Sequence, residues 1–191
     1  MANPKTFIEE AASAGRGVLA LIVGDRKAGR HFDLGLRGLA SSLIAFLGVN
    51  AVMAYVPALM SPSPHDGAIG TGLLLSLGLA AIPIALAALV LRQMKRLDGF
   101  VPFLVADFWA NSFLSVVMAL LLLAGTPFEL TVIGLGIVVL VVEINIARLI
   151  VTLTPLQVAS FVVAQFAGGL VGVMLLGMLV GAPADVAGIP A

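Results

Sequence analysis

The chain has 191 residues, of which 61% are hydrophobic and only 10% are charged. Soluble domains carry about a quarter charged residues, so water is not the main solvent of this chain. The formal net charge is zero, which excludes a whole-protein attraction to nucleic acid, and the lack of cysteine excludes disulfides, thiolate metal sites and thiol nucleophiles.

The first predicted element is an amphipathic helix within residues 1–37, a segment expected to remain in the cytoplasm. Its apolar residues recur at three- and four-residue steps, whereas Glu10, Ser13 and Arg16 lie elsewhere around the helix. The apolar positions are Phe7, Ala11, Ala14, Val18, Leu21 and Ile22. This pattern predicts a helix that lies in the plane of the membrane interface.

A basic cluster of Arg26, Lys27 and Arg30 follows this helix. At a membrane surface that contains anionic lipid, each cation contributes about 1 kcal/mol to binding. We therefore predict that these three side chains contact lipid headgroups, and that membrane lipids are partners of the chain. Ordinary positive-inside anchoring is the alternative interpretation of the same residues.

Five apolar stretches are each long enough to cross a hydrocarbon core of roughly 30 Å, which takes about twenty helical residues. They are residues 38–60, 68–91, 100–124, 131–152 and 156–180. Helices are expected because these stretches lack the alternation of barrel strands and must satisfy their own backbone hydrogen bonds. The predicted fold is all-α: a polytopic bundle of five transmembrane helices at 38–180, preceded by the interfacial helix and followed by an outer tail at 181–191.

The connections between the predicted spans are short and rich in turn-forming residues, at 61–67, 125–127 and 154–155. No loop is long enough to form a soluble catalytic domain. With five spans, every lysine and arginine falls on one side of the membrane, which the positive-inside rule assigns to the cytoplasm. We expect a multi-pass protein of the bacterial inner membrane with its N-terminus in the cytoplasm and its C-terminus outside.

Ionisable side chains inside a span are costly, so they are candidates for function. Asp107 in the third span is followed at four-residue steps by Asn111 and Ser115, which forms a polar stripe that should face the bundle. Phe103 on the same helix is expected to face lipid. Arg148 in the fourth span lies at roughly the depth of Asp107, which predicts an ion pair between the two antiparallel helices.

Glu143 lies about 140° around the fourth span from Arg148 and is therefore poorly placed to share that arginine, so a hydrogen bond to Asn111 is expected instead. Asn50 in the first span and Gln165 in the fifth also lie near the midplane. The candidate polar site therefore consists of six residues: Asn50, Asp107, Asn111, Glu143, Arg148 and Gln165. Three interpretations of this site are possible. In decreasing order of preference, its residues form hydrogen bonds that hold the helices together, form a transport or proton-relay site, or form a catalytic site.

Outside the candidate polar site the sequence contains no recognisable catalytic or metal-binding motif. His31 and His65 are isolated, and the sequence contains no zinc-protease, phosphate-binding or serine-hydrolase pattern. We therefore predict no catalytic, cofactor-binding or metal-ligating residues, and a protein that is not an enzyme.

Glycines of the last span recur at four-residue steps, at Gly168 and Gly172 and again at Gly177 and Gly181. Small residues at this spacing allow two helices to approach closely. They predict tight packing of the last span and, as one interpretation, a homo-oligomer formed through it.

Residues 24–46 read GDRKAGRHFDLGLRGLASSLIAF. This stretch, with the layout of an amphipathic N-terminus, five helices and an outer C-terminus, resembles bacterial members of the Yip1 family of small membrane proteins. The resemblance implies a non-enzymatic role in membrane organisation or partner recruitment. Our leading hypothesis is a scaffold or subunit that contacts lipids and other membrane proteins, and the alternative is a small transporter or channel that uses the candidate polar site.

Overall fold

The structure is a computed structural model that describes the backbone of residues 6–60 and 68–180. Side chains are described at 6–53 and 77–175, so the predicted loop 61–67 and the tail 181–191 lie outside the described residues. Over the described backbone the chain is helical and contains no strand. The elements are α1 (Phe7–Ile22), η1 (Ala28–His31), α2 (Leu36–Met60), α3 (Ala68–Gln93), η2 (Leu97–Gly99), α4 (Phe100–Leu123), α5 (Phe128–Asn145), η3 (Ile146–Ile150) and α6 (Pro155–Val180).

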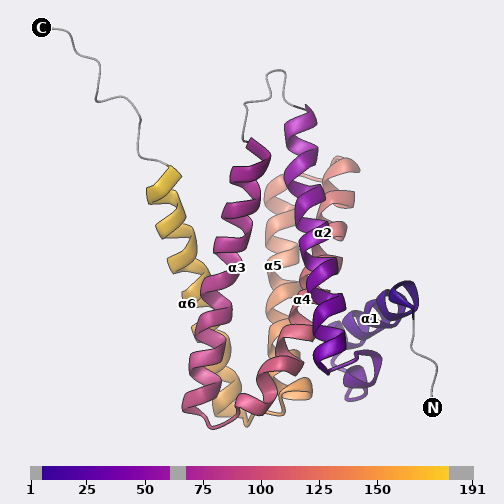
Figure 1. The fold of residues 1–191 in the computed structure, drawn as a ribbon, viewed down its shortest axis with the longest axis vertical. Coiled ribbons are helices and arrows are strands. Elements are labelled where there is room, and N and C mark those ends of the chain that lie inside the picture. The colour runs from indigo at the N-terminus through magenta and orange to yellow at the C-terminus, as the bar shows by residue number, and fades with distance from the viewer. Residues whose placement is uncertain (1–5, 61–67, 181–191) are drawn as a thin grey trace, which may run out of the picture.

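The five long helices α2 to α6 run side by side along the long axis of the molecule, and α1 lies across their flank (Figure 1). Two pairings dominate the packing, α3 with α6 and α2 with α4, while α5 packs mainly on α4 and α1. Neither dominant pair is adjacent in the chain. The bundle therefore consists of an α3–α6 pair set beside a group formed by α1, α2, α4 and α5.

The turns η1, η2 and η3 gather at one end of the bundle, which we call the basic end because Arg30, Lys95 and Arg148 are exposed there (Figure 1). The core lies toward this end. Its largest fully buried side chains include Leu21 of α1 and Phe161 of α6, whereas leucines toward the opposite end of α4 are exposed. Such exposure of apolar side chains is ordinary for helices that face lipid.

By length and composition, four of the described helical segments could cross a membrane: Leu36–Met53, Leu97–Leu123, Phe128–Ile150 and Pro155–Leu175. On α3 the described side chains form a shorter apolar segment, Leu77–Gln93. The chain is thus an all-helical protein with helices compatible with a multi-pass membrane protein. The predicted count of five spans stays a prediction.

The helix boundaries follow local signals in the sequence. α1 begins with a capping box that the sequence analysis did not use, in which the Glu9 amide donates to Thr6 Oγ1 and the Thr6 amide donates to Glu9 Oε2, at 3.3 and 2.8 Å. α4 ends where Gly125 adopts a left-handed conformation, with φ of 81°, and α5 begins after the turn. The predicted turn at 125–127 is confirmed.

The polar face predicted for α1 is wrong at two positions. Glu10 and Ser13 are buried, because α1 packs against the bundle and both side chains find partners there: Glu10 accepts from the Ser41 hydroxyl, and Ser13 Oγ donates to the His31 carbonyl at 2.7 Å. The outward side instead carries apolar residues, with Ile8 79% and Leu19 65% exposed.

Candidate functional site

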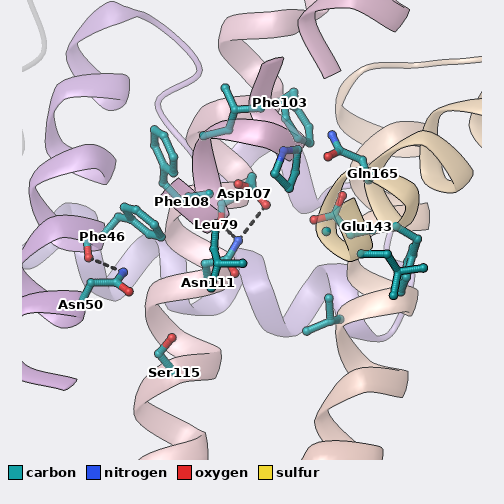
Figure 2. Close-up of a pocket in the computed structure, with 17 residues that line it drawn as sticks. Phe46, Asn50, Leu79, Phe103, Asp107, Phe108, Asn111, Ser115, Glu143 and Gln165 are labelled. Atoms are coloured by element: carbon teal, nitrogen blue, oxygen red, sulfur yellow. Dashed lines mark hydrogen bonds between the residues drawn. The ribbon is translucent and has the colours of Figure 1, made fainter. Parts of the chain in front are cut away.

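A cavity of about 540 Å³ lies inside the bundle, between the α3–α6 pair and the helices α2, α4 and α5 (Figure 2). All five long helices contribute to its wall. Its polar lining residues are Asn50, Asp107, Asn111, Ser115, Glu143 and Gln165. The structure therefore brings together five of the six residues of the candidate polar site, and adds Ser115 from the predicted stripe.

The polar stripe of α4 faces this cavity as the four-residue spacing predicted. Asn111 Nδ2 donates to Asp107 Oδ1 at 2.8 Å and to the Asp107 carbonyl at 3.1 Å (Figure 2). Ser115 lines the cavity one turn further along the helix. The amide of Asn111 is thus used on its own helix, so it is Asp107, and not Glu143 as expected, that Asn111 binds.

Glu143 of α5 meets Asp107 across the cavity, and the two carboxyl groups lie within interaction range of each other. Glu143 Oε2 is buried without a hydrogen-bond partner among the described residues. Two acidic side chains therefore line the same cavity. Lysine, arginine and histidine do not occur among the described residues that line it.

The predicted ion pair between Asp107 and Arg148 is wrong. Arg148 lies outside the cavity lining and is exposed at the basic end, in the π-helical turn η3. Among the described residues Arg96 and Asp98 form an ion pair, with 3.4 Å between Nε and Oδ1. The reason is rotational: the face of α5 that meets Asp107 belongs to Glu143, and Arg148 points about 140° away from that face in helical geometry.

Two amides complete the polar lining. Asn50 Nδ2 donates to the Phe46 carbonyl of its own helix at 2.8 Å. Gln165 of α6 is only 9% exposed, and its Nε2 has no hydrogen-bond partner among the described residues. A buried donor without a partner costs about 1–3 kcal/mol, and such groups require an explanation.

Aromatic rings form much of the remaining wall. Phe46 of α2 stacks on Phe108 of α4 with 5.0 Å between ring centroids, and Phe103 meets Phe161 edge-on at 5.1 Å. The expectation that Phe103 faces lipid is wrong, because this ring is 2% exposed and lines the cavity. The sequence analysis missed these rings, although Phe46 lies one helical turn from Asn50 and Phe108 lies next to Asp107.

The predicted lipid-contact residues Arg26, Lys27 and Arg30 are exposed between α1 and η1 or within η1. Exposure leaves them accessible to headgroups, and that contact stays a prediction. Within the described residues, no group of three or more histidine, cysteine or acidic side chains is arranged to hold a metal ion.

The glycine step at Gly168 and Gly172 is used inside the chain. A Cβ built on Gly168 would lie 3.2 Å from Pro83 Cα, and one on Gly172 would lie 3.4 Å from Leu79 Cδ2, so both glycines face α3. This contact accounts for the close pairing of α3 with α6. The second step predicted, at Gly177 and Gly181, lies outside the residues whose side chains are described.

Comparison of the chain with protein-family models, with curated proteins and with solved structures gives no match. The resemblance to the Yip1 family therefore stays a prediction. The function has to be argued from the cavity and its residues.

Proposed function

We propose that all five long helices cross the membrane, with the basic end in the cytoplasm. α3 has 26 residues, as many as α6, and packs against it over a long contact (Figure 1). Every lysine and arginine lies before α2 or at the helix ends that meet at the basic end. This distribution is the one that the positive-inside rule associates with the cytoplasmic face of an inner membrane.

We propose that α1 lies at the cytoplasmic interface of the bilayer. Its outward side carries Ile8, Leu19 and Val23, which are 79, 65 and 79% exposed, next to the exposed Arg16. Its other side is held by the bundle, so the outward apolar residues would enter the boundary between headgroups and acyl chains.

We propose that the protein binds a small polar solute in the central cavity and carries it across the membrane. The observation that supports this most directly is a cavity lined by two acidic side chains that contains unpartnered polar atoms, Glu143 Oε2 and Gln165 Nε2. Ligand pockets have volumes of about 300–1,000 Å³ and a few convergent polar groups in an apolar wall, which describes this cavity of about 540 Å³. Charged groups at membrane depth commonly mark substrate or ion pathways.

The arrangement favours this function over a purely structural role for the polar residues. Polar residues that hold helices together do so by hydrogen bonds from one helix to another. Here Asn50 and Asn111 are bonded within their own helices, and Gln165 Nε2 has no hydrogen-bond partner among the described residues. Among the described lining residues, the polar contact between helices is confined to the carboxyl groups of Asp107 and Glu143, and the other polar side chains line a shared space.

Water access to the cavity tests the proposal, and a chain without cysteine is suited to single-cysteine labelling. We expect Ser115→Cys, in the cavity, to react with the impermeant cationic thiol reagent MTSET in mild detergent. Leu120→Cys is the matched control, because Leu120 lies on the same helix but is 60% exposed on its outer surface and would face hydrocarbon. Equal, negligible labelling of both variants would indicate a dry core and would exclude a solute site.

The same reagent tests the orientation in intact cells. Glu129→Cys, exposed at the end opposite the basic end, should react from outside, and Lys27→Cys should react only after the membrane is permeabilised. Labelling of Lys27→Cys in intact cells would reverse the proposed topology.

A further inference from the structure

The chemistry of the ligand can be argued from the atoms that the cavity leaves without partners. The acidic side of the cavity offers acceptors: Glu143 Oε2 is buried and unpartnered, and Asp107 keeps only Asn111 and the other carboxyl as neighbours of its charge. An anion is disfavoured there, because it would lie beside two acidic side chains, with no lysine, arginine or histidine among the described lining residues.

The described part of the protein places no positive charge beside these two carboxyl groups. Arg148 is exposed at the basic end, and Arg96 is occupied elsewhere, since its Nη2 donates to the Val151 carbonyl at 2.6 Å and to Thr152 Oγ1 at 2.9 Å. A ligand that carries a positive charge would provide it. A divalent metal ion is a poor fit to this cavity, because no group of three or more histidine, cysteine or acidic side chains among the described residues is arranged to hold one.

The rest of the wall suits an organic cation. The stacked rings of Phe46 and Phe108 and the ring of Phe103 stand beside the carboxyl of Asp107 (Figure 2). The faces of aromatic rings attract ammonium groups, by about 0.5–2 kcal/mol depending on hydration. Their hydrocarbon surface also accommodates the alkyl substituents of such a cation.

Gln165 adds a second requirement. Its Nε2 is a donor without a partner, on a side chain that is 9% exposed and lines the same cavity as Glu143 (Figure 2). If the ligand leaves Gln165 Nε2 unpaired, the desolvation cost of this donor remains. A hydroxyl or carbonyl oxygen on the ligand would accept its hydrogen bond and remove that cost. The oxygen would have to lie within a few bonds of the ammonium group, because Gln165 and Glu143 line the same cavity of about 540 Å³.

We propose that the cavity binds an organic ammonium cation that carries an oxygen acceptor a few bonds from its nitrogen. The N–H group lies between Asp107 and Glu143, the oxygen accepts from Gln165 Nε2, and the alkyl groups contact Phe46 and Phe108. This assignment rests on the proposed function, because it names the solute class for the same cavity.

Three probes of almost equal shape separate the requirements: 2-(diethylamino)ethanol has both groups, 3-ethyl-1-pentanol lacks the charge, and N,N-diethylpropylamine lacks the oxygen. Affinities are measured by calorimetry on the purified full chain in mild detergent. Because charge-assisted hydrogen bonds are about twice as strong as neutral ones, we expect the amino alcohol to bind at least about tenfold more tightly than the neutral alcohol. Loss of the oxygen should cost a further factor of roughly three to ten.

Variants connect these differences to the named residues. Glu143→Gln should remove most of the preference for charge, whereas the control Glu129→Gln, an exposed carboxyl near the other end of α5, should retain it. Gln165→Leu should abolish the preference for the amino alcohol over the simple amine. The comparison of probes on the unchanged protein remains decisive if either variant fails to fold.

The outcomes separate this inference from the proposed function. If Ser115→Cys is labelled but the charged and neutral probes bind equally, or neither binds, the cavity is hydrated and the ligand class is wrong. If Ser115→Cys is not labelled and no probe binds, both proposals fail. Protection of Ser115→Cys from MTSET by the amino alcohol, and not by the neutral alcohol, would support both.

Discussion

The close contact between α3 and α6 gives a sharp test of the fold. Gly168 of α6 faces α3, where an added Cβ would lie 2.8 Å from Leu86 Cδ1 and 3.2 Å from Pro83 Cα. The leucine methyl can rotate aside, but the proline backbone moves only if α3 moves. Substitution Gly168→Ala should therefore displace the two helices by a few tenths of an ångström.

The magnitude follows from a matched control. Gly134→Ala introduces the same methyl group on α5, where no atom lies within 4 Å of the added Cβ. Both substitutions gain the same helix propensity, roughly 1 kcal/mol, so it cancels in their difference. Overpacking by one methyl group costs about 1–3 kcal/mol, and we expect Gly168→Ala to be less stable than Gly134→Ala by this amount.

Unfolding in mixed micelles of mild detergent with increasing dodecyl sulfate measures this difference in the free energy of unfolding. Equal stability of the two alanine variants would mean that α6 does not pack on α3 through Gly168. The oligomeric state of each variant should be measured in parallel. A change from oligomer to monomer in Gly168→Ala, without a change in stability, would assign this glycine step to contact between copies of the chain.

Two side chains that bridge distant segments give the remaining predictions. Arg96→Lys should lower the free energy of unfolding by about 1 kcal/mol, because one ammonium group cannot replace the hydrogen bonds of the guanidinium to Val151 and Thr152. The loss is limited because the Arg96 side chain is 30% exposed. Asn145→Leu should loosen α1, because it removes the buried bond of 2.8 Å from Asn145 Nδ2 to the Leu21 carbonyl. Thermal unfolding measures the effect of Arg96→Lys. For Asn145→Leu we expect a stability loss of about 1–3 kcal/mol, measured as faster amide exchange in α1.

Each of these variants has a control of the same type. Arg92→Lys changes an exposed arginine on α3 and should be neutral, within about 0.5 kcal/mol. Ser160→Ala removes a bond to the Leu156 carbonyl within the exposed first turns of α6 and should leave exchange in α1 unchanged. Equal effects in variant and control would refute the bridging role of Arg96 or Asn145.

The positions of the helices could be predicted from the sequence, because they depend on the length of apolar stretches and on turn-forming residues between them. The stretch at 100–124 became α4 (Phe100–Leu123), and the stretch at 131–152 became α5 with its π-helical extension η3. The polar stripe of Asp107, Asn111 and Ser115 could also be predicted from the sequence, because residues four apart on a helix share a face whatever surrounds the helix.

The partners of each helix face were decided only by the tertiary structure. α3 to α6 are apolar around nearly their whole circumference, so the sequence does not mark the side that meets a neighbour. For this reason matching depth alone suggested Arg148 as the partner of Asp107, and the rotation of α5 selected Glu143 instead. The pairing of α3 with α6, which places Gly168 against Pro83, joins segments far apart in the chain. Two carboxyl groups and the Gln165 amide line one cavity as a result of that packing, since each residue comes from a different helix.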